Sequence, residues 1–80
     1  MLEVTGTFES LDETVTPKVI VLKVRGADAS GPLWNGCTFF DEKETPLTLE
    51  DFAERYLQRN VTLEIIEETG EIFSGRPAKR

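Results

Sequence analysis

Basic and aromatic residues occur close together in one stretch of the chain. The basic members are Lys18, Lys23 and Arg25, and the aromatic members are Trp34, Phe39 and Phe40. Proteins that bind single-stranded nucleic acid combine aromatic rings, on which bases stack, with cations that follow the phosphates. The pattern therefore predicts a surface for single-stranded nucleic acid composed of Lys18, Lys23, Arg25, Trp34 and Phe40.

The aromatic part of this surface depends on which face of the segment 33–41 is buried. If Cys37 and Phe39 face the core, strand alternation places Trp34 and Phe40 on the outside. The alternative is that Gly36 introduces a bulge and that at least one of these aromatic residues belongs to the core. A chain with seven aromatic residues needs most of them inside. The core interpretation is therefore favoured for Phe40 and is as good as the exposed one for Trp34.

The net charge opposes nucleic acid as the partner. Fifteen acidic residues face nine basic ones, which gives a formal charge of −6. Proteins that hold phosphates are usually basic, although a local basic strip can act within a Debye length of ~8–10 Å. The alternative prediction is an acidic interaction module, inhibitor or accessory subunit that binds a basic protein. Glu67, Glu68 and Glu71 would contact such a partner, or would be ordinary charges at a strand edge.

Several kinds of catalytic and metal chemistry are excluded by composition. The chain has no histidine and one cysteine, so neither a nucleophile–histidine pair nor a zinc site of histidines or several thiolates is possible. Cys37 is best interpreted as a core thiol. The acidic run at 41–44 lacks the spacing of a calcium loop and is interpreted as a solvated loop. We therefore predict no enzymatic activity, no metal and no cofactor.

The segment 45–66 changes its period from helical to strand-like. Thr48 is a good N-cap with Asp51 three residues later, and Leu47 and Phe52 have the spacing of a hydrophobic staple. Asp51 and Arg55 are expected to form an ion pair along the helix. Asn60 is expected to end the helix, because asparagine tolerates the left-handed conformation.

The remaining segments have the patterns of strands and loops. Strands are predicted over 2–9, 18–25, 33–41, 61–67 and 71–74, and 26–32 is predicted to be a loop because it is rich in Gly, Ser and Asp. A hairpin turn is expected at 67–71, with Gly70 at positive φ.

The order of these segments predicts an all-β fold with one helix. Three strands, the helix and two further strands can close into a small five-stranded barrel, and this is the order of the OB-fold. The helix would plug one end of the barrel with Leu49, Phe52, Ala53, Tyr56 and Leu57. We expect one domain over residues 1–75, followed by a basic tail at 76–80.

The segment 52–65 resembles the corresponding part of the bacterial single-stranded DNA-binding proteins of the OB-fold family. The matching positions are Ala53, Tyr56, Leu57, Val61 and Leu63, whereas Asn60 stands where the family usually has a turn glycine. The resemblance implies an OB-fold with a single-strand binding surface on its second and third strands.

The sequence also gives an expectation for the location of the protein. No apolar run approaches the ~20 residues that cross a bilayer, and the N-terminus has no signal-peptide pattern. We expect a cytoplasmic protein that does not contact membranes, with its oligomeric state left open.

Overall fold

The computed structural model describes residues 1–78 as six strands and one short helix. The elements are β1 (Leu2–Asp12), β2 (Val19–Val24), β3 (Ala27–Phe40), β4 (Pro46–Leu47), α1 (Leu49–Tyr56), β5 (Asn60–Ile65) and β6 (Ile72–Pro77). The predicted all-β class with one helix is confirmed. The predicted number of five strands is wrong, because the two-residue strand β4 pairs with the end of β3 just before the helix.

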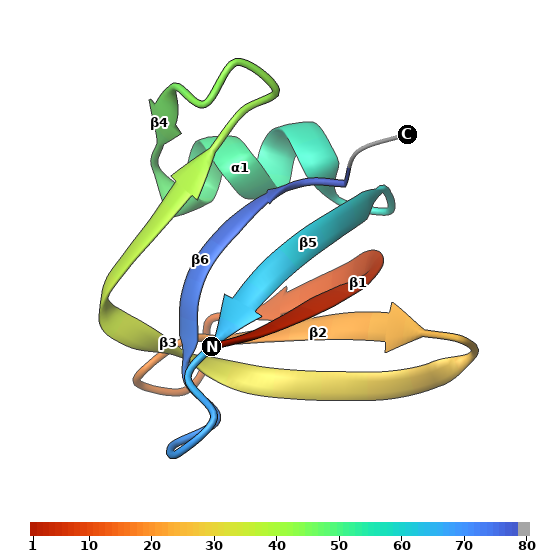
Figure 1. Ribbon diagram of the computed structural model, residues 1–80, viewed down its shortest axis with the longest axis vertical. Helices are drawn as coiled ribbons and strands as arrows, with labels where there is room; N and C mark the ends of the chain where they lie inside the picture. The colour runs from red at the N-terminus through yellow and green to blue at the C-terminus, as the bar shows by residue number, and fades with distance from the viewer. Residues whose placement is uncertain (79–80) are drawn as a thin grey trace.

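Five of the strands form a closed ring (Figure 1). β1 pairs with β2 and β5, β3 pairs with β2 and β6, and β5 pairs with β6. All of these contacts are antiparallel except the one between β3 and β6, which is parallel. β1 and β3 can each reach two neighbours because they are long, with 11 and 14 residues. The ring therefore turns its alternate side chains towards one shared core.

The first half of β3 corrects the sequence interpretation. Residues 27–32 were predicted to lie in a loop, but they pair with β2 along its whole length. Arg25 and Gly26 form the connection and both have positive φ, 52° and 83°. A two-residue turn of this kind matches the twist of a tight hairpin. Composition was misleading here, because small residues in a strand resemble a loop when their pairing partner is unknown.

The helix lies across one end of the ring (Figure 1). It begins after Thr48, whose Oγ1 accepts a hydrogen bond from the Asp51 N–H at 3.2 Å, as the cap prediction requires. Phe52 and Tyr56 are buried, with exposed fractions of 0% and 4%. The predicted plug is therefore confirmed for these two residues. Leu57, which was also assigned to the plug, is 44% exposed.

The end of the helix differs from the prediction. The helix stops at Tyr56, and Asn60 is the first residue of β5. The left-handed residue is Gln58, with φ 66°. Its backbone N–H donates to the Phe8 carbonyl at 2.7 Å, and its side-chain amide donates to the Glu9 carbonyl at 3.0 Å. Contacts with β1 thus offset the strain of a non-glycine residue at positive φ.

The C-terminal strand is longer than expected. β6 takes in Arg76 and Pro77, which the sequence assigned to a basic tail. Ala78 follows the strand and its N–H donates to the Asn60 carbonyl at 3.1 Å, whereas Lys79 and Arg80 of the predicted tail lie outside the described residues. Within residues 1–78, no helix has the length and apolarity that a bilayer crossing requires.

Candidate functional site

Two of the three basic residues of the predicted surface, Lys18 and Lys23, lie close to carboxylates. Lys18 Nζ is 3.8 Å from a Glu50 oxygen and 3.9 Å from a Glu13 oxygen. Lys23 Nζ is 4.0 Å from a Glu9 oxygen. Exposed pairs of this kind contribute little to stability, but each carboxylate offsets the positive charge that a phosphate would meet. The two lysines therefore do not present an uncompensated positive strip.

The predicted surface is also spread along the ring. Lys23 is aligned with Asp28, which lies six positions before Trp34 on β3. At ~3.3 Å per residue, this is roughly 20 Å of strand. Arg25 lies in the turn beyond Lys23, whereas Lys18 is close to Trp34 in the alignment because the Leu33 N–H donates to its carbonyl at 3.0 Å. The structure thus brings Lys18 towards Trp34 and leaves Lys23 and Arg25 at the far end of β2.

The aromatic residues are divided between the core and the surface. Phe39 is buried against Phe52, with ring centroids 4.7 Å apart. Phe40 is half-buried where β3 pairs with Pro46. Trp34 is 37% exposed and is therefore the most exposed aromatic residue of the predicted set.

Trp34 stacks on an aromatic residue that sequence reasoning did not select. Its ring centroid lies 5.1 Å from that of Phe73, and the two ring planes differ by 26°. Phe73 is half-buried on β6. We call Trp34 and Phe73 the aromatic pair. The short strand predicted at 71–74 contained Phe73, but no local signal showed that β6 would lie beside β3.

A bulge in β3 accompanies the aromatic pair. Leu33 is aligned with Ile72 and Thr38 with Ser74, so more residues of β3 than of β6 lie between these two points. This irregularity lies in the segment where the alternative interpretation places a bulge, around Gly36. Bulges bend a strand and redirect its side chains.

A second bulge lies in β6 at the other member of the pair. Ile65 is aligned with Ile72 and Glu64 with Ser74, so Phe73 has no counterpart on β5. Two irregularities in neighbouring strands thus occur where the two rings stack. The rings lie on the outside of the sheet, although the neighbouring Ile72 is buried.

Gly36 fixes the position of the indole ring. A Cβ atom at this position would lie 2.6 Å from Cζ3 of Trp34, closer than real contacts allow. The ring therefore lies over the backbone of Gly36 on one side and against Phe73 on another. The residue type at position 36 is needed for this arrangement, because any other residue would displace the indole.

An acidic hairpin adjoins the aromatic pair. The connection between β5 and β6 carries Glu67, Glu68 and Glu71, and Gly70 has the predicted positive φ, 75°. The hairpin lies close to β3, because the Gly70 carbonyl oxygen would be 3.0 Å from a Cβ at Gly31. The surroundings of the pair therefore include negative charge.

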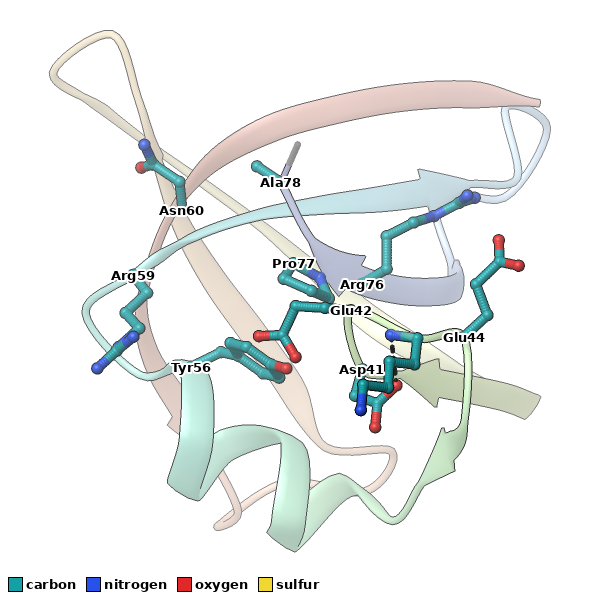
Figure 2. Close-up of a pocket in the computed structure, with 10 residues that line it drawn as sticks. Asp41, Glu42, Glu44, Tyr56, Arg59, Asn60, Arg76, Pro77 and Ala78 are labelled. Carbon is teal, nitrogen blue, oxygen red and sulfur yellow. Dashed lines mark hydrogen bonds between the residues drawn. The ribbon is translucent and has the colours of Figure 1, made fainter. Parts of the chain in front are cut away.

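A separate open groove lies near the C-terminal end of β6 (Figure 2). Its volume is about 1230 Å³, and it is bounded by the loop after β3, the end of α1, the start of β5 and the end of β6. The lining residues are Asp41, Glu42, Lys43, Glu44, Tyr56, Arg59, Asn60, Arg76, Pro77 and Ala78. Figure 2 shows the side chains of Glu42 and Tyr56 close together, and hydrogen bonding to the Tyr56 hydroxyl lowers the pKa of Glu42. The groove mixes both signs of charge and favours no ligand class.

The Asp41 carboxylate stabilises the conformation of the loop 41–45 through hydrogen bonds to the loop backbone. Its Oδ1 accepts hydrogen bonds from the N–H groups of Lys43 at 2.8 Å and Thr45 at 2.9 Å. Its Oδ2 lies 4.0 Å from Arg55, for which Asp51 was the predicted partner. These contacts, with the Thr45 hydrogen bond the largest cause, lower the pKa of Asp41. The loop is thus a structural connection, as the solvated-loop interpretation requires.

We expect this carboxylate to make stability depend on pH in the acid range. The folded-state pKa of Asp41 is lowered from 3.8, so its contribution is present above that value and is lost as pH falls through the lowered pKa. Asp41→Asn should be less stable than the wild type at neutral pH and should lose less stability on acidification. Urea unfolding at a series of pH values measures this, with Glu54→Gln as the control. If the free energy of unfolding of Asp41→Asn fell with decreasing pH as steeply as that of the wild type, the role assigned to the Asp41 carboxylate would be contradicted.

Two further observations concern the cysteine and the potential metal ligands. Burial raises the pKa of the Cys37 thiol to about 12, so this group is protonated and unreactive at neutral pH. Within residues 1–78, no three His, Cys, Asp or Glu side chains are grouped as metal ligands would be. Neither observation assigns a chemical reaction to the surface of the described chain.

Comparisons with protein-family models, with curated proteins and with solved structures gave no match. The chemistry of the surfaces is therefore what bears on function. Of these, the aromatic pair places a 37% exposed tryptophan against a half-buried phenylalanine on the surface of a small protein.

Proposed function

We propose that this chain is a non-catalytic binding module with an OB-type barrel. The proposal is supported by the ring order β1–β2–β3–β6–β5 and by the helix between β3 and β5. The OB-fold is a five-stranded, partly open Greek-key barrel whose second and third strands bind ligands. In this chain β4 would be a short addition at the end of β3 and not a member of the barrel.

The observation that carries the proposal is the outward-facing aromatic pair. A chain of 80 residues gains most by burying its aromatic side chains, yet Trp34 and Phe73 stack on the outside where two strands are irregular. Exposed aromatic clusters are typical of binding surfaces, where tryptophan is enriched among the residues that contribute most to affinity. We therefore place the binding surface at this pair.

The partner that the charges favour is a basic, extended segment of another protein. The chain carries a net charge of −6, and Lys18 and Lys23 each lie within 4.0 Å of a carboxylate. The acidic hairpin with Glu67, Glu68 and Glu71 adjoins the pair. Complementary charge speeds association and selects among partners. The distribution of charge thus favours a cationic chain over a phosphate chain.

A second candidate is single-stranded nucleic acid, the ligand predicted from the cation and aromatic pattern. The specific observation in its favour is the half-exposed aromatic stack, because bases of any sequence can extend such a stack. Lys18 would be the nearest of the predicted cations, through its hydrogen-bonded neighbour Leu33. Salt would weaken both kinds of complex, so the ligand itself must be varied.

The test uses Trp34, the only tryptophan, as the reporter. We expect its fluorescence to change saturably when a short peptide of alternating lysine and arginine is added at low salt, and to stay constant with mixed-sequence single-stranded DNA. A response to DNA alone would establish the second candidate instead. No response to either ligand would overturn the assignment of the surface.

Two matched variants test whether the ligand binds at the aromatic pair, and both keep Trp34 as the reporter. Phe73→Ala should weaken peptide binding by about tenfold, the size expected for a central interface residue. Leu57→Ala removes another exposed apolar side chain, at the end of the helix, and should leave affinity unchanged. Circular dichroism checks that both variants are folded. Equal affinities of the two variants would place the ligand elsewhere.

A further inference from the structure

We infer that Trp34 and Glu71 together bind the guanidinium group of an arginine in the partner, and that Glu71 makes the surface prefer arginine to lysine. This inference rests on the proposed function and specifies the chemistry of the bound residue. It uses a carboxylate that the sequence interpretation treated only as part of an acidic hairpin.

Strand register places Glu71 beside the aromatic pair. Leu33 of β3 is aligned with Ile72 of β6 in a parallel contact. The preceding positions, Pro32 and Glu71, are therefore neighbours, and the following positions are the two members of the pair. Phe73 is two residues after Glu71, and Trp34 is two residues after Pro32, the neighbour of Glu71, so each aromatic residue is about 6–7 Å further along an extended chain. This distance is within the reach of one arginine side chain that contacts both.

Strand alternation places the Glu71 side chain on the same side of the sheet as the pair. Ile72 is 1% exposed and points into the core, so its two neighbours point away from the core. The Glu71 backbone is held in place, because its carbonyl accepts from the Ile66 N–H at 2.8 Å and its N–H donates to Thr69 Oγ1 at 3.2 Å. The carboxylate is therefore carried on a fixed backbone.

The charge of Glu71 is available to a partner. Among residues 1–78, ion pairs within 4.0 Å involve Glu3, Glu9, Glu13, Asp41, Glu50 and Glu64, and not Glu71. Glu64 of β5, which is aligned with Ser74, already accepts a hydrogen bond from Arg76 at 2.7 Å. Glu71, unlike Glu64, thus has no ion-pair partner within the described residues.

An arginine fits this arrangement better than a lysine. The planar guanidinium can stack on an indole and at the same time donate two hydrogen bonds to a carboxylate in its own plane. A lysine ammonium is compact and strongly hydrated, so it makes either contact less well and does not stack. Tryptophan is the best aromatic partner for a cation. The predicted preference follows from the combination of the two side chains.

The experiment compares hexa-arginine with hexa-lysine, again through Trp34 fluorescence. We expect the wild type to bind hexa-arginine roughly fivefold more tightly. Glu71→Gln should abolish this preference while keeping the fold. Glu68→Gln is the matched control, because it removes the same charge from the same hairpin three residues away. It should weaken both peptides slightly and leave the preference intact.

The outcomes separate this inference from the proposed function. Equal affinity for the two peptides in the wild type, or equal effects of the two glutamate substitutions, would overturn the inference and leave a binding module that recognises only diffuse positive charge. A constant Trp34 signal with both peptides would overturn the proposed function as well.

Discussion

Phe52→Ala should destabilise the protein by about 3–5 kcal/mol, the range for removing a buried phenylalanine. Phe52 has an exposed fraction of 0%, and its ring lies 5.8 Å from Phe8, 4.7 Å from Phe39 and 5.1 Å from Tyr56, measured between ring centroids. These rings belong to β1, β3 and α1. The lost side chain would leave a cavity where the helix packs against the closed sheet. The neighbouring aromatic side chains are fixed on three different elements, so they cannot all move to fill it.

This loss is large relative to the stability of a chain of 80 residues. Typical values per residue give a total of roughly 4–12 kcal/mol, so the variant is expected to be partly unfolded at room temperature if the total lies near the lower bound. Urea unfolding followed by circular dichroism measures the difference. Glu54→Ala, on the exposed side of the same helix, is the control. A Phe52→Ala midpoint close to that of the control would show that the helix is not a plug.

Gly75→Ala should lower the free energy of unfolding by about 1–3 kcal/mol, because it adds a methyl group where the core has no room. A Cβ at position 75 would lie 2.7 Å from Cδ1 of Phe39 and 2.9 Å from Cδ2 of Leu63. Both of these side chains are buried, with exposed fractions of 3% and 2%. Their displacement would therefore disturb the packing of β3 and β5 at once.

Gly36→Ala provides a matched comparison with Gly75→Ala. Its Cβ would also be too close to an aromatic ring, at 2.6 Å from Cζ3 of Trp34, but this ring is on the surface and can swing outwards. We expect a clearly smaller loss of stability and a shift of the Trp34 emission, since the indole loses its place on the strand. Thermal unfolding and fluorescence spectra measure the two effects. Similar losses of stability for both variants would refute the distinction between a packed core ring and a movable surface ring.

The sequence predicted the elements whose signals are local. The N-cap at Thr48 and the buried side of the helix at Phe52 and Tyr56 depend on residues a few positions apart, and both were found. The position of Gly70 in the last turn also depends only on its neighbours. In each case the residue type determines the conformation that the backbone adopts.

The features that were missed depend on residues far apart in the chain. The first half of β3 became a strand because β2 pairs with it, and Gln58 adopts a left-handed conformation because β1 offers it two carbonyl groups. The aromatic pair needs β6 to lie beside β3, which no local pattern specifies. The candidate binding surface could therefore be predicted only for its Trp34 half.

The parallel contact between β3 and β6 has a consequence for how the chain folds during its synthesis. β6 is the last strand described, and it joins the free edges of β3 and β5. A nascent chain that stops before Ile72 leaves both edges open, and open strand edges are templates for pairing with other chains. Contacts between such distant segments also form slowly, since loop closure precedes any gain from them. The edges of β3 and β5 are therefore protected from aggregation only after β6 has emerged from the ribosome.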